Sequence, residues 1–177
     1  GTSEGEAALM HAKALLTPLS LTQSHLLLSI IHFMGGDWPQ AVEMARLGAT
    51  HAAQANDDLL KAVSQDFVRW SQSRMGQTQT LDVPESRASK TQEASSQPAL
   101  FADWLNAAEA EITLSLGQVA EALALAEQSL KTAQTVNSDF SHGLAERFWA
   151  QALAALNTPP WDKIETHLAA SLQAFQA

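Results

Sequence analysis

The chain of 177 residues contains no cysteine and no tyrosine, and only 10 of its residues are valine or isoleucine. Without cysteine it cannot form disulfides, thiolate metal sites or a cysteine nucleophile. The scarcity of β-branched residues disfavours sheets, which select them. The chain holds 32 alanines and 24 leucines instead, the residues that cost least in a helix. The composition therefore predicts an all-α protein.

Basic residues are scarce as well, with 10 lysines and arginines against 19 acidic residues and a formal net charge of −9. Because nucleic-acid binding needs clustered basic residues, we expect no nucleic-acid partner. The uncharged run 14–36 is broken by Pro18, hydroxyl residues and two histidines, so it predicts a buried helical hairpin and no membrane association. The lack of cysteine and of a basic-then-apolar leader favours a cytoplasmic location.

A period of about 40 residues organises the chain. Gly36, Gly76 and Gly117 follow one another at 40 and 41 residues, and Pro160 comes 43 residues later. Gly36, Gly117 and Pro160 each follow one apolar helical stretch and precede another, which is typical of turns between paired helices. The pattern predicts helices over 4–16, 20–34, 38–55, 57–75, 99–116, 118–135, 139–156 and 161–176.

One segment departs from this period. In residues 76–98, 11 of 23 residues are glutamine, serine or threonine and none is aromatic. We expect residues 77–98 to be a degenerate repeat or a flexible loop that proteases cut first.

Small residues recur on the helices that follow the turns. One such stripe consists of Ala41, Met44, Ala45, Gly48, Ala52 and Ala55, and it is repeated by Ala122, Leu125, Ala126, Ser129, Leu130 and Ala133. The last predicted helix carries a corresponding stripe with mostly larger side chains, which consists of Ile164, Leu168, Ser171, Leu172 and Phe175. We expect these stripes to face the core, so that Leu168→Ala costs about 2–5 kcal/mol of stability.

The text around the first turn resembles the tetratricopeptide repeat. Gly36-Asp37-Trp38 stands at the turn, with Ser29 before it and Ala41 and Ala45 after it, and Ala110, Gly117, Ala122, Ala126 and Ala152 fall at equivalent places. Arg69 is a departure, because the pattern has a small residue there. The resemblance implies an α-solenoid of antiparallel helix hairpins, a right-handed superhelix, as a single domain over residues 1–177. The long period is similar to that of repeats in large bacterial signalling ATPases and transcription regulators, of which this chain would be a fragment.

Candidate chemical sites are few. His25 and His32 lie seven residues apart without a nearby carboxylate to complete a metal site. Glu109 and Glu111 are spaced to point to different helix faces, and the run from Asp139 to His142 holds triad residue types without triad spacing. Phosphate-binding loops and nucleophile elbows are absent from the sequence. We therefore expect no enzyme, no metal and no cofactor.

The resemblance places the first helix of each pair on the inner curve of the superhelix. Leu26, Ile30, Phe33, Trp149 and Leu153 would then line an apolar groove and bind a partner. Truncating Trp149 would cost about 2 kcal/mol of affinity, as interface anchors do. The expected function is a protein-interaction or regulatory scaffold, whose partner is a protein, a peptide or another domain of the parent protein. The alternative is a ligand-sensing module that takes a small apolar molecule in this groove.

Two further surface features carry expectations. The open ends of the repeat array, near helices 4–16 and 161–176, would promote homo-oligomerisation. No basic residue lies between Lys90 and Lys131, whereas six acidic residues do. This asymmetry indicates either a solvated acidic face or a docking surface for a basic partner.

Overall fold

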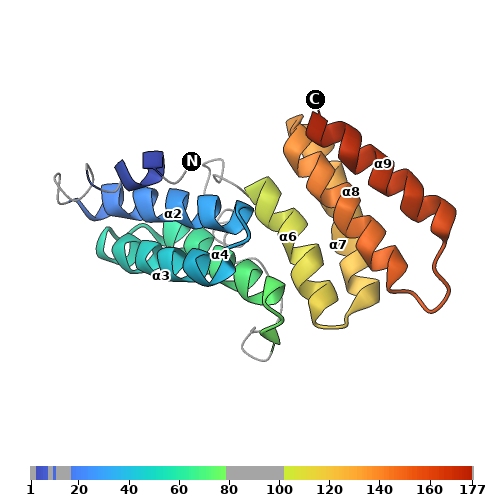
Figure 1. Cartoon of the computed structure of the whole chain (residues 1–177), viewed down its shortest axis with the longest axis horizontal. Helices are drawn as coiled ribbons and strands as arrows, with labels where there is room; N and C mark the ends of the chain where they lie inside the picture. Colours follow the sequence, from blue (N-terminus) through green and yellow to red (C-terminus); the bar gives the residue numbers. More distant parts are fainter. Residues whose placement is uncertain (1–2, 8–9, 11–16, 79–101, 177) are drawn as a thin grey trace. The chain divides into compact units, whose positions relative to one another are not determined.

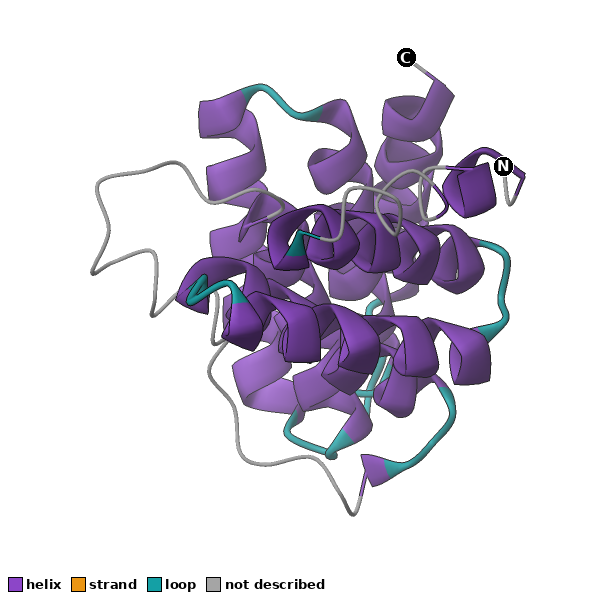
Figure 2. Cartoon of the chain, turned by 90° about the vertical axis from the view of Figure 1, so that its left-hand side faces the viewer, coloured by secondary structure: helices purple, strands orange, loops and turns teal. Residues whose placement is uncertain are grey.

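The structure is a computed structural model that describes residues 3–7, 10, 17–78 and 102–176 (Figure 1). Throughout these ranges the chain forms helices joined by short turns, with no strand (Figure 2). The prediction of an all-α fold is confirmed. The chain divides into two compact units, Gly1–Leu100 and Phe101–Ala177, which are described separately here.

The first unit contains helices α2 (Pro18–Met34), α3 (Trp38–Gln54) and α4 (Asp58–Arg74). Each helix packs against the next, and α2 also contacts α4. Of the expected helix 4–16, residues 3–7 and Met10 are described and helical. Gly5 lies so close to α2 that a Cβ atom there would be 2.6 Å from Leu28 Cδ2. Of the segment 77–98, residues 79–98 lie outside the described residues.

The second unit contains α6 (Ala102–Ser115), α7 (Val119–Val136), α8 (Asp139–Ala154) and α9 (Trp161–Gln176). Consecutive helices pack against each other, and α6 also contacts α8. Each unit therefore repeats the same local arrangement, in which a helix contacts its neighbour and the next helix but one. Among the helices that the structure describes, none has the length and apolar character needed to cross a membrane.

The turns explain the 40-residue period. Gly36, Gly76 and Gly117 have φ values of 80°, 70° and 80°, a left-handed conformation that glycine adopts without steric cost. In the turns after α3 and α7, asparagine takes the place of glycine. Asn56 and Asn137 both have a φ of 54°. Asparagine is among the few other residues that tolerate this conformation. Asn137 follows Asn56 by the same 81 residues by which Gly117 follows Gly36.

Capping side chains set where the helices begin. The carboxylates of Asp37 and Asp57 accept hydrogen bonds from the backbone N–H groups of Gln40 and Leu60, at 3.4 and 2.9 Å. These caps satisfy N–H groups that have no partner within the helix. The Gly-Asp pair at residues 36 and 37 thus ends one helix and starts the next.

Small residues allow the helices to approach closely. The fourth, eighth, eleventh and fifteenth residues of α3 are Ala41, Ala45, Gly48 and Ala52, those of α7 are Ala122, Ala126, Ser129 and Ala133, and all are buried. A Cβ atom on Gly48 would lie 3.1 Å from Ser64 Oγ of α4 and 3.7 Å from the Leu26 nitrogen of α2. The stripe of α3 therefore lies where α2 and α4 both approach. These eight residues face the interior, as predicted, whereas the other predicted members, Met44, Ala55, Leu125 and Leu130, are half-buried.

We expect Gly117→Ala to lower the free energy of unfolding by about 1–2 kcal/mol, the cost of placing an L-residue in the left-handed region. No atom lies within 4 Å of the added Cβ, so the loss would come from the backbone conformation alone. Gly117→Asn is the matched control and should lose less, because asparagine already holds this conformation at position 137. Urea denaturation followed by circular dichroism measures both; equal losses would contradict this account.

Candidate functional site

The five predicted groove residues do not lie on an open surface. Leu26 and Phe33 of the first unit and Leu153 of the second are buried, whereas Ile30 and Trp149 are half-buried. The Phe33 ring packs on Trp70 and Phe67 of α4, with ring centroids 4.3 and 6.2 Å away. Phe33 therefore lies at the contact between α2 and α4. The face of α2 that the sequence predicts to line the groove is the face that packs on α4. Buried side chains of this kind stabilise their own unit rather than meet a partner.

Trp149 packs within the second unit. Its ring stacks on the imidazole of His167 of α9, with centroids 4.5 Å apart and planes at 23°. It also lies against the buried cluster of Ala150, Leu153 and Ile164. Its half-buried side chain therefore contributes to the contact between α8 and α9.

A buried carboxylate connects the same two helices. One oxygen of Glu146 accepts a hydrogen bond from His167 Nδ1 at 2.5 Å, and the other lies 3.3 Å from His142 Nε2. The Glu146 side chain is almost fully buried, and the two imidazoles are less so. Sequence spacing does not reveal this cluster, because His167 is 21 residues from Glu146 and meets it only through packing.

The cluster has the geometry of a structural link. His142 contacts Glu146, while the Ser141 hydroxyl donates to the carboxylate of Asp103, so no Ser-His-Asp relay forms there. Of the two histidines weighed for metal binding, His25 has its Nδ1 2.8 Å from the carbonyl oxygen of Leu21 in its own helix. The other, His32, does have a carboxylate nearby, since its Nδ1 lies 3.6 Å from Asp37 Oδ2. Within the described ranges, no three histidine or acidic side chains are placed to share a metal ion.

We expect Glu146→Ala to lower the free energy of unfolding of the second unit by about 1–3 kcal/mol, because it leaves buried donors unsatisfied. His167→Ala should lower it too, and the double variant should show a coupling energy of about 0.5–3 kcal/mol. His142→Ala is the control, since its ring is more exposed and its contact with Glu146 is longer. Denaturant unfolding of the four proteins gives the coupling; additive effects of Glu146→Ala and His167→Ala would contradict the link.

The acidic residues of the second unit do not form one surface. Glu109 is buried and Glu111 is half-buried, 3.8 Å from Arg147 Nη2 of α8. Glu127 is exposed and pairs with Lys131 at 2.9 Å. Some of the acidic residues between Lys90 and Lys131 are therefore buried and others are exposed. This weakens the interpretation of the segment as a docking surface for a basic partner.

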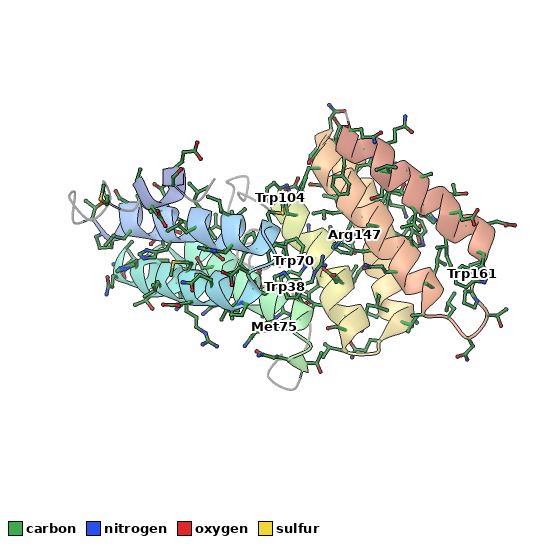
Figure 3. All side chains as sticks on the ribbon, in the orientation of Figure 1. Trp38, Trp70, Met75, Trp104, Arg147 and Trp161 are labelled. Carbon is green, nitrogen blue, oxygen red and sulfur yellow. The ribbon has the colours of Figure 1, made fainter. Side chains whose placement is uncertain are left out.

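The most prominent exposed feature is an apolar face of α9, which we call the α9 stripe. Its members are large side chains on one side of the helix that remain open to solvent: Trp161 (63% exposed), Leu168 (47%), Leu172 (60%) and Phe175 (43%). Trp161 is labelled at the beginning of α9 in Figure 3. Buried Ile164 and Ser171 lie beside this stripe, on the side of α9 that faces α8, and the Ser171 hydroxyl donates to the Gly143 carbonyl of α8 at 2.8 Å. The Phe175 ring, at the edge of the stripe, also packs on Phe140 of α8, with ring centroids 5.6 Å apart.

The prediction that Leu168 is a core residue is wrong. It occupies the eighth position of α9, which in α3 and α7 is held by the buried residues Ala45 and Ala126. Those two helices each pack against a following helix as well as a preceding one. Among the described helices α9 packs extensively only against α8, and Leu168 stays 47% exposed. Periodicity identifies an apolar face but not whether another helix covers it.

No protein-family model, no curated protein and no solved structure matches this chain.

Proposed function

We propose that this chain is a non-catalytic interaction module that binds a protein partner through the α9 stripe. The observation that carries the proposal is the exposure of four large apolar side chains on one helix face. Exposed apolar patches of this kind on a soluble fold are typical of interaction sites. Aromatic side chains such as Trp161 and Phe175 are the usual energetic anchors of interfaces.

The helical-repeat interpretation supports this role. The recurring left-handed glycines, the small-residue stripes at equal helix positions and the contacts of α2 with α4 and of α6 with α8 are what a tetratricopeptide-like α-solenoid requires. In a right-handed solenoid each repeat covers the face of the one before it. An apolar repeat face that stays exposed, such as the α9 stripe, is therefore a candidate docking surface.

The context of a larger bacterial signalling protein rests on the resemblance of the turn sequences alone, and the cytoplasmic location rests on the sequence composition. The alternative, a sensor that takes a small apolar molecule in an inner groove, has less support. Leu26, Phe33 and Leu153, which would line that groove, are packed inside their own units.

Site-specific photo-crosslinking in cells tests the proposal. A photoreactive residue at position 172, in the stripe, should form a discrete crosslinked species with one protein. The same group at Thr166, which is exposed on α9 outside the stripe, is the matched control. Indistinguishable patterns at the two positions would remove the support for the α9 stripe as a binding surface.

A further inference from the structure

We propose that the partner of the α9 stripe is a second copy of the chain, whose own α9 lies antiparallel to the first. This inference rests on the proposed function and names the partner. Three features of α9 carry it: the size of the stripe, its spacing along the helix and the distribution of charge.

The size of the stripe suits a modest symmetric interface. From the exposed fractions, the four side chains present on the order of 400 Å² of apolar surface, about the largest patch on a typical monomer. Two copies would bury about twice that area, and flanking polar residues would bring the total to roughly 1,200 Å², the lower end of specific interfaces. An interface of this size predicts a dimer with a Kd in the micromolar range, on the order of 1–100 μM.

The spacing of the stripe is that of a helix-pairing seam. Trp161, Glu165, Leu168, Leu172 and Phe175 follow one another at four, three, four and three residues. This alternation places side chains along one line that another helix can follow, as in coiled coils. Where α3 and α7 have small residues that admit a close neighbour, α9 has Leu168 and Phe175. Large side chains suit the interlocking of two such seams.

The charges on α9 select the antiparallel orientation. Its charged residues Asp162, Lys163 and Glu165 lie in the first half, whereas residues 168–176 carry no charge. A parallel pair would place Glu165 against Glu165, and like charges at such close range are destabilising. An antiparallel pair with its two-fold axis at Leu168 places Trp161 opposite Phe175 and Glu165 near Leu172. Each charged half then meets an uncharged half, so the two Glu165 side chains are kept apart.

Sedimentation of the intact chain over about a hundredfold range around the micromolar Kd tests whether it dimerises. The mass should rise from 19.0 kDa towards twice that value. Leu172→Glu should weaken the dimer at least about tenfold, because it places a charge in an apolar seam. Gln173→Glu adds the same charge at an exposed position beside the stripe and should dimerise like the parent.

Disulfide trapping tests the orientation, and the absence of native cysteine makes it unambiguous. Leu168→Cys should form a disulfide-linked dimer readily, because residue 168 lies on the two-fold axis. Glu165→Cys should link to Leu172→Cys in a mixture of the two variants, but not to itself. Self-linking of Glu165→Cys as efficient as that of Leu168→Cys would overturn the antiparallel arrangement.

A monomer at every concentration, or a dimer that Leu172→Glu leaves intact, would overturn the second copy as the partner. Neither result would disprove the proposed function, which fails separately if position 172 gives no specific crosslink in cells. Far-ultraviolet circular dichroism of each variant shows that its helices are retained. A Leu172→Glu protein that had lost them would be replaced by Leu172→Gln, whose polar side chain should also weaken the dimer while Gln173→Glu does not.

Discussion

Replacing Trp70 with alanine is expected to remove about 3–5 kcal/mol from the free energy of unfolding of the first unit, the usual cost of deleting a buried aromatic ring. Trp70 is only 1% exposed, although it is one of the largest side chains in the chain. Its ring contacts those of Phe33 and Phe67, with centroids 4.3 and 5.9 Å away. The three rings connect α2 with α4, so the cavity would open at the contact that links alternate helices.

Trp161→Ala is the matched control for this prediction, because it makes the same chemical change at a side chain that is 63% exposed. It should alter the free energy of unfolding by about 0.5 kcal/mol or less. Both variants are measured by urea denaturation followed by circular dichroism, at a concentration low enough that dimerisation does not contribute. A loss for Trp161→Ala as large as that for Trp70→Ala would contradict the assignment of the two tryptophans to surface and core.

The helices and turns could be predicted from the sequence because local chemistry determines them. Gly36 and Gly117 are the residues that a left-handed turn requires, and Asp37 is the cap that starts α3. The predicted ends of the helices are accordingly within about three residues of those observed. Asn56 and Asn137 also adopt the left-handed conformation in turns. Their spacing of 81 residues is the same as that of Gly36 and Gly117, so it is a second sequence signal of the repeat.

The exposure of individual side chains could not be predicted in the same way. A helix of this fold has two apolar faces, and the spacing of its residues does not tell which face meets a neighbour. Leu26 and Phe33 were assigned to an open groove but are buried, whereas Leu168 was assigned to the core but is exposed. The contact of Glu146 with His167 has the same origin, since it depends on how α8 and α9 pack. Such features follow from tertiary packing and carry no local pattern.

Arg69, which departs from the tetratricopeptide pattern, takes part in a buried ion pair. Its guanidinium is buried in α4, where the tetratricopeptide pattern has a small residue, and its Nη1 atom lies 3.4 Å from the carboxylate of Asp66. Both side chains are almost fully buried. A buried arginine is stable only beside an acceptor of opposite charge, because the cost of removing an isolated charge from water is very large. Asp66 therefore supplies part of the compensation that the Arg69 guanidinium needs.

Asp66→Ala is accordingly expected to lower the free energy of unfolding of the first unit by about 3–5 kcal/mol, the range found when one partner of a buried ion pair is removed. The double replacement Asp66→Leu with Arg69→Met should recover at least half of that loss, since an apolar pair of similar volume removes the buried guanidinium together with its acidic partner. Exposed Asp58 of the same helix provides the control, and Asp58→Ala should cost about 0.5 kcal/mol or less. If the double variant were no more stable than Asp66→Ala, the loss would come from the missing volume and hydrogen bonds of Asp66 rather than from the buried charge of Arg69.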